Sequence, residues 1–132
     1  MNVLADFVKR EDFKKEKHVP VIEAPTKVRK NTPFEVKVTV GKEIPHPNTT
    51  EHHIRWIKVF FHPEGDPYVY EIGDYEFNAH GESVQGPNTG AVYTEPIVVT
   101  VVKLNKSGKI IALSYCNIHG LWENSLDVVV EE

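Results

Sequence analysis

The only cysteine in this chain of 132 residues, Cys116, stands three positions before His119 in the run YCNIHG. A thiolate and an imidazole at this spacing can bind the same transition-metal ion. Soft sulfur combined with borderline nitrogen suits iron or copper better than magnesium or calcium. A buried free cysteine is also an ordinary core residue, so the motif by itself leaves a purely structural interpretation open.

Further candidate ligands lie upstream, in the segments EKHVPVIE and IPHPNTTEHHIRW. They are Glu16, His18, His46, His52 and His53. His46 lies between two prolines, and the residue before a proline is driven to an extended conformation, which predicts a stiff loop. His52 and His53 are adjacent and would point to opposite sides of an extended chain, and the hydrophobic pattern around them does not choose between them.

The stretch Glu16-Lys17-His18 has two interpretations. In an extended segment the side chains of Glu16 and His18 face the same side, toward one centre, whereas Lys17 points away. A charged stretch is otherwise typical of a solvated surface. His62 precedes a proline and His80 precedes a glycine, so we expect both to be turn or packing histidines rather than ligands.

Length and composition restrict the class of protein. We expect a single domain over residues 1–132, in which residues 1–15 form a charged N-terminal extension. The formal net charge of −4 provides no basic face for nucleic acid. No segment approaches the roughly 18 apolar residues of a membrane span. The single cysteine, with an N-terminus that lacks the apolar core of a signal peptide, predicts a cytoplasmic protein.

The elements that must position these residues are strands. Seven segments have strand-like patterns, near residues 27–30, 34–40, 53–62, 68–78, 92–104, 109–115 and 126–130. About seven short strands in one domain favour an all-β fold, an immunoglobulin-like sandwich or barrel. Residues 97–102 are apolar on both faces, which indicates a central strand or one that a neighbouring subunit covers. The charged first 18 residues are expected to hold a short helical turn.

Three segments together resemble a known family. EKHVPVIE, GKEIPHPNTTEHHIRW and ALSYCNIHGLWEN, with HGESVQGPNTG and VYTEP between them, are similar to the one-iron superoxide reductases, also called neelaredoxins. The resemblance runs from about Glu16 to Asn124. The larger relatives, the desulfoferrodoxins, carry an extra domain in which four cysteines bind a second iron, and one cysteine cannot build that site.

The resemblance implies a mononuclear non-haem iron that alternates between Fe²⁺ and Fe³⁺. It implies four equatorial histidines, one axial cysteinate, a carboxylate that binds and leaves the sixth position, and a lysine near the open face. The matching residues are His18, His46, His52, His119, Cys116, Glu16 and Lys17. Superoxide would be reduced to hydrogen peroxide, and a rubredoxin-like electron donor would restore Fe²⁺. The family also implies a homo-oligomer, with a tetramer favoured.

Two other classes of protein remain to be compared. A blue copper electron carrier also combines a β-sandwich with cysteine and histidine ligands, but it usually has an axial methionine, and the only methionine here is Met1. A structural zinc site of one cysteine and three histidines would need only four ligands. The colour of the protein separates the three, because zinc is colourless and the two coloured metals differ in their spectra.

Overall fold

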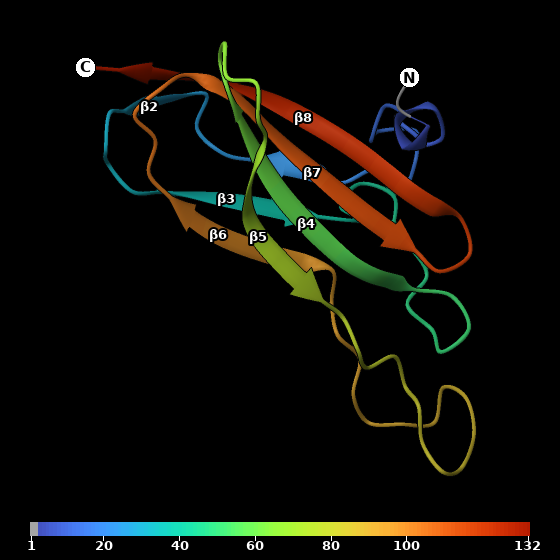
Figure 1. Ribbon diagram of the computed structural model, residues 1–132. Coiled ribbons are helices and arrows are strands. Elements are labelled where there is room, and N and C mark those ends of the chain that lie inside the picture. The colour runs from blue at the N-terminus through green and yellow to red at the C-terminus, as the bar shows by residue number, and fades with distance from the viewer. Residues whose placement is uncertain (1–2) are drawn as a thin grey trace.

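The structure is a computed structural model that describes residues 3–132, and it consists of two β-sheets that face each other (Figure 1). The elements are the 3₁₀ helix η1 Leu4–Asp6 and the strands β1 Val21–Glu23, β2 Lys27–Arg29, β3 Phe34–Thr39, β4 Ile54–Pro63, β5 Tyr70–Glu76, β6 Ile97–Val102, β7 Gly108–Cys116 and β8 Gly120–Glu131. One sheet has the order β1-β3-β6, and the other has the order β2-β8-β7-β4-β5. All neighbours are antiparallel except β2 and β8.

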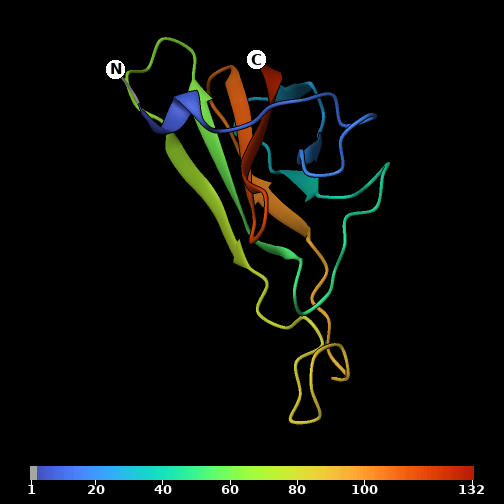
Figure 2. The same cartoon turned by 90° about the vertical axis from the view of Figure 1, so that its right-hand side faces the viewer.

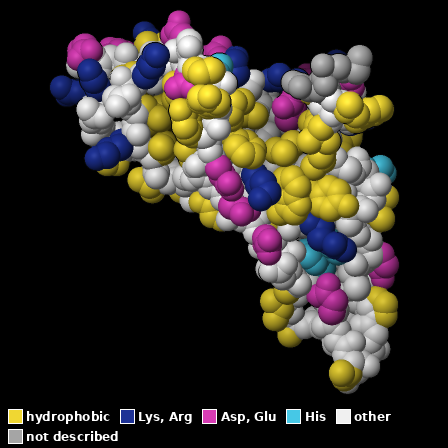
Figure 3. Space-filling view, viewed as in Figure 1, with side chains coloured by type: hydrophobic (Ala, Val, Ile, Leu, Met, Phe, Trp, Pro, Cys, Tyr) yellow, Lys and Arg dark blue, Asp and Glu magenta, His cyan; other side chains and the backbone are white. Residues whose placement is uncertain are grey.

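Alternation along the strands places the core between the two sheets. β3 buries Val36 and Val38 and exposes the residues between them, and β7 likewise buries Ile110 and Ala112. Side chains alternate between the faces of a strand, so each strand contributes one apolar row to the same interior. The outer face of the five-stranded sheet also carries apolar side chains, and η1 lies on this face (Figures 2 and 3). Residues of η1 line a pocket there together with Phe60 and Leu113.

The fold confirms the predicted all-β class, with differences in detail. Eight strands are present in residues 3–132 instead of seven, because the three-residue β1 carries too short a pattern to detect. β8 begins at Gly120, earlier than the predicted 126, since residues 120–126 are half-buried and include polar residues. A helical turn does occur near the N-terminus, as η1.

Of the two interpretations of residues 97–102, the central strand is wrong, and coverage by a neighbouring subunit stays a prediction. β6 is an edge strand of the three-stranded sheet. Val98 and Thr100 are buried, whereas Ile97, Val99 and Val101 are 48%, 45% and 64% exposed. The strand is apolar on both faces although one face is exposed in the single chain, so hydrophobicity alone could not show which face packs on the core.

The ends of three segments meet at one end of the sheets. Ile54 at the start of β4 pairs with Cys116 at the end of β7. The loop before β4 therefore lies beside the turn between β7 and β8, while the long connection from β5 to β6 projects past the sheets (Figures 1 and 2). Within the described residues, no helix has the length and apolar character needed to span a membrane.

Candidate metal centre

Loops and strand ends at this end of the sheets bring the predicted ligands together. His18 precedes β1, His46 and His52 lie in the connection from β3 to β4, and Cys116 ends β7. His119 lies in the tight turn between β7 and β8. Potential ligand atoms of His18, His52, Cys116 and His119 all lie within 4.8 Å of one another. These four residues come from three regions that are distant in the sequence.

His46 lies against this cluster. Its ring packs edge-on against those of His18 and His52, with centroid distances of 4.8 and 4.9 Å. Its Nδ1 donates a hydrogen bond to the carbonyl of Pro47 at 2.6 Å, which leaves Nε2 available. The Nε2 atoms of His46 and His52 are buried and lack a hydrogen-bond partner among residues 3–132.

A metal ion fits these unpaired nitrogen atoms. Buried polar atoms without partners are costly, and native proteins nearly always satisfy them. A donor set of four imidazoles and one thiolate is soft enough for iron, copper or zinc. The arrangement therefore has the features expected of a transition-metal site.

The turn between β7 and β8 supports the sulfur of Cys116. The Cys116 side chain is fully buried, and the backbone N–H of His119 donates a hydrogen bond to its Sγ at 3.4 Å. Gly120 closes the turn with φ +80, a backbone conformation that side chains with a Cβ rarely adopt. A donor to the sulfur tunes the basicity of a metal-bound thiolate.

Trp122 is a further residue of the site that the sequence patterns did not identify. Its ring stacks on the His18 imidazole with a centroid distance of 4.9 Å and an interplanar angle of 15°. Its Nε1 donates a hydrogen bond to the carbonyl of His119 at 3.2 Å. A tryptophan in a strand usually signals only core packing, so its position in the motif GLW gave no hint of this contact.

Glu16 contacts His18 instead of the centre of the cluster. Its carboxylate accepts hydrogen bonds from the backbone N–H and from Nδ1 of His18, at 2.5 and 2.6 Å. Burial raises the pKa of Glu16, but the hydrogen bonds from His18 outweigh this effect and the net pKa is lowered. In this structure Glu16 thus orients the His18 ring and leaves its Nε2 directed at the cluster.

Burial lowers the pKa of three imidazoles of the site. Burial lowers the pKa of His46 to about 4, against an opposing hydrogen bond to Pro47. Burial also lowers the pKa values of His52 and His18. The positive charge of Lys17 contributes to the lowered pKa of each of these three histidines, after burial and other effects. Lys17 therefore acts electrostatically on the cluster.

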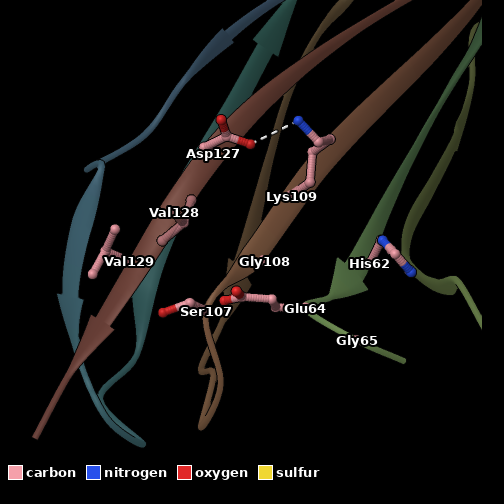
Figure 4. A pocket seen from close by; sticks show the side chains of 9 residues that line it. All are labelled: His62, Glu64, Gly65, Ser107, Gly108, Lys109, Asp127, Val128 and Val129. Atoms are coloured by element: carbon pink, nitrogen blue, oxygen red, sulfur yellow. Dashed lines mark hydrogen bonds and ion pairs between the residues drawn. The ribbon is translucent and has the colours of Figure 1, made fainter. Parts of the chain in front are cut away.

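The remaining histidines lie outside the cluster, although Nε2 of His80 is also buried without a hydrogen-bond partner among residues 3–132. His53 and His80 are buried and stack face to face, with centroids 3.4 Å apart. His62 lies near the opposite end of β4, where its Nε2 donates to the carbonyl of Asp66 at 2.7 Å. It lines a pocket of about 380 Å³ that also contains the Lys109–Asp127 ion pair (Figure 4). Within residues 3–132, the one group of at least three potential ligands is the cluster around Cys116.

An all-β fold with a mixed histidine and cysteine cluster defines a class of non-haem metalloproteins. The family model described as desulfoferrodoxin matches residues 10–125. The chain therefore belongs to the desulfoferrodoxin family.

Individual relatives are similar over nearly their whole length. The superoxide reductase of Pyrococcus furiosus is 60% identical over 124 residues, covering 94% of this chain and 98% of its own. A crystal structure of a Thermotoga maritima protein is 80% identical with a TM-score of 0.96, and the alignment covers 98% of both chains. The reduced neelaredoxin of Archaeoglobus fulgidus is 56% identical with a TM-score of 0.86, covering 93% of this chain and 98% of its own.

Proposed function

We propose that this protein is a superoxide reductase of the one-iron type. Superoxide would gain one electron and two protons and leave as hydrogen peroxide, without formation of dioxygen. Membership of the desulfoferrodoxin family supports this activity. The observation that carries it is the cluster of Cys116 with His18, His52 and His119, against which His46 packs. The Nε2 atoms of His46 and His52 in this arrangement are buried and unpaired among residues 3–132.

We assign the iron ligands to His18, His46, His52, His119 and Cys116. Bound iron would supply the single electron as it passes from Fe²⁺ to Fe³⁺. Three of the imidazoles have lowered pKa values, because burial disfavours their charged forms, so they are neutral and able to bind metal near neutral pH. The Cys116 thiolate would add the soft ligand that favours iron over harder cations.

Two charged residues would act on the substrate side. Lys17 would attract the superoxide anion, since the protein as a whole carries a formal charge of −4 and would otherwise repel it weakly. Glu16 would act as an exchangeable ligand of the oxidised iron. To do so its carboxylate must give up its hydrogen bonds with His18, which are short and local.

Several wider features belong to the same proposal. We expect one domain over residues 1–132, a rubredoxin-like electron donor and a homo-oligomer with four subunits. Apolar side chains on the open face of β6 support burial against another subunit. A cytoplasmic location is consistent with the single cysteine, because a reducing compartment keeps it free for metal binding.

Metal analysis combined with visible spectroscopy tests the proposal. The purified protein should contain one iron per chain, develop a visible thiolate-to-iron absorption band on oxidation and lose it on reduction. It should consume superoxide with peroxide as product, provided that an electron donor is present. A colourless zinc protein or a copper spectrum would contradict the assignment.

A further inference from the structure

Asn117 links two segments that carry candidate ligands. It follows Cys116 directly, and its side chain reaches the loop that contains His52. The Oδ1 atom accepts the backbone N–H of His53 at 2.9 Å, and Nδ2 donates to the carbonyl of Glu51 at 2.9 Å. The backbone N–H of Asn117 also donates to the carbonyl of His53 at 3.2 Å. These hydrogen bonds lie on both sides of His52.

The primary amide of asparagine suits this position. It offers an acceptor and donors within one planar group, whereas an aspartate lacks the donor and an apolar residue lacks both. Pairing between β4 and β7 ends at Ile54 and Cys116, where the backbone of β7 turns away. Beyond this pair, one backbone hydrogen bond from Asn117 to His53 and the two hydrogen bonds of the Asn117 side chain continue the connection between the two segments.

The other hydrogen bonds of the His52 loop lie within the loop or reach the connection between β5 and β6, as from Thr50 Oγ1 to the carbonyl of His80 at 2.6 Å and from the Thr50 N–H to Oδ1 of Asn88 at 2.8 Å. The His52 N–H donates to Oγ1 of Thr49 at 3.0 Å, and the Thr49 N–H donates to the His52 carbonyl at 2.9 Å. These bonds define the shape of the loop. Among the described residues, none of these bonds reaches the turn that carries Cys116 and His119, so the hydrogen bonds of Asn117 are the direct ones between the loop and the turn.

We propose that Asn117 is a positioning residue that holds the His52 imidazole at a defined place relative to the Cys116 sulfur. The inference rests on the proposed function, because both residues are there assigned to one iron ion. Residues that orient metal ligands typically change metal affinity by about 10- to 100-fold when they are replaced. Asn117→Ala should therefore weaken metal binding while the metal-free protein stays folded.

Cobalt(II) provides a test that does not depend on superoxide reduction. Metal-free protein is titrated with Co²⁺ against a chromophoric chelator, and the thiolate-to-cobalt and d–d absorption bands are recorded. We expect Asn117→Ala to raise the Kd for Co²⁺ about 10- to 100-fold and to alter the d–d bands. The Kd of Asn117→Asp for Co²⁺ should lie between those of Asn117→Ala and the parent, because aspartate retains only the acceptor for the His53 N–H.

Ser107→Ala is the matched control. Ser107 Oγ accepts the N–H of Val130 at 2.8 Å, so its loss also removes a hydrogen bond between a side chain and the backbone, but at the other end of β7. Its Kd for Co²⁺ should stay within about two-fold of the parent, even if its thermal stability falls as much as that of Asn117→Ala. If Asn117→Ala does not fold, Asn117→Asp and Asn117→Ser provide the comparison.

A double-mutant cycle with His52→Ala tests whether Asn117 changes metal affinity through His52. When His52 is absent, Asn117→Ala should change the Kd by less than about two-fold, since nothing remains for it to position. Unchanged affinity in the single variant, or full additivity in the cycle, would overturn the positioning role and leave the metal centre intact. A parent protein that binds no Co²⁺ through its thiolate would instead overturn the proposed metal centre.

Discussion

The Nε2 atom of His18 and the Nδ1 atom of His119 lie 3.1 Å apart, although the two residues are 101 positions apart in the sequence. Two nitrogen ligands at right angles around one ion, with bonds of about 2.0–2.1 Å, would be separated by about 2.9 Å. The fold thus holds this pair close to the spacing that neighbouring ligands of a single metal ion require. Trp122 stabilises the arrangement by contacting both residues, through its ring and its Nε1.

Replacement of Cys116 by serine tests the sulfur ligand. Cys116→Ser should remove the visible thiolate-to-iron band and nearly all superoxide reduction. The metal-free fold should lose only about 1–2 kcal/mol, because a hydroxyl of similar size would still accept the N–H of His119. Absorption spectra, superoxide consumption and thermal unfolding measure the three effects. A variant that keeps both the colour and the rate would show that Cys116 is not a ligand.

Removal of the Lys17 charge tests electrostatic steering. Lys17→Ala should slow the second-order reaction with superoxide about two- to five-fold at low salt and flatten its dependence on ionic strength. Exposed charges attract an anion through a field that salt screens over about 8–10 Å. Pulse radiolysis at several salt concentrations measures the slope. Lys27→Ala removes an equal charge in β2, far from the cluster, and should leave the slope unchanged; equal slopes in parent and Lys17→Ala would exclude steering.

Replacement of Glu16 tests two roles of one carboxylate. Glu16→Ala removes the acceptor for Nδ1 of His18, so we expect iron affinity to fall about 10- to 100-fold. The oxidised protein should also bind azide or cyanide more easily and show a shifted absorption maximum, while the first reaction with superoxide is nearly unchanged.

Glu16→Gln separates these roles. Its amide oxygen can still accept from His18, so iron affinity should recover, whereas the loss of charge should keep the oxidised iron open to anions. Anion titrations and pulse radiolysis with spectral recording provide the measurements. If Glu16→Ala slows the first step strongly and leaves the oxidised spectrum unchanged, Glu16 is not an exchangeable ligand.

Acidification should destabilise the protein before it affects most carboxylates. Burial lowers the pKa of His46 to about 4 from its ordinary value of 6.5. Above pH 6.5 the imidazole is neutral in both folded and unfolded chains. Between these two values the unfolded chain binds the proton and the folded chain does not, so the free energy of unfolding falls as the pH falls.

Denaturant unfolding of the metal-free protein at a series of pH values measures this loss. His52 and His18, whose pKa values are also lowered by burial, should add to it. Metal affinity should decline over the same range because protons compete for the imidazoles. His46→Gln should reduce the pH dependence of unfolding; a profile identical to that of the parent would contradict the lowered pKa.

The sequence by itself determined the class of fold and predicted the residue types of the candidate metal site. Alternation in residues 34–40 indicated a half-buried strand, because the period of two matches the geometry of a strand. The local spacing of Cys116 and His119 indicated metal binding, and the resemblance of three segments to a known family made iron the expected metal. Local patterns, however, could not choose between His52 and His53, and only the resemblance favoured His52.

Tertiary structure decided what depends on contacts between distant segments. It placed His52 in the cluster and His53 in a stack with His80. The side chains of these adjacent residues point to different sides of the loop, and only the fold decides which side faces Cys116. It also placed β6 at an edge, although its sequence is apolar on both faces. The contacts of Trp122 with His18 and of Asn117 with Glu51 join segments that no sequence period relates, so only the folded chain brings them together.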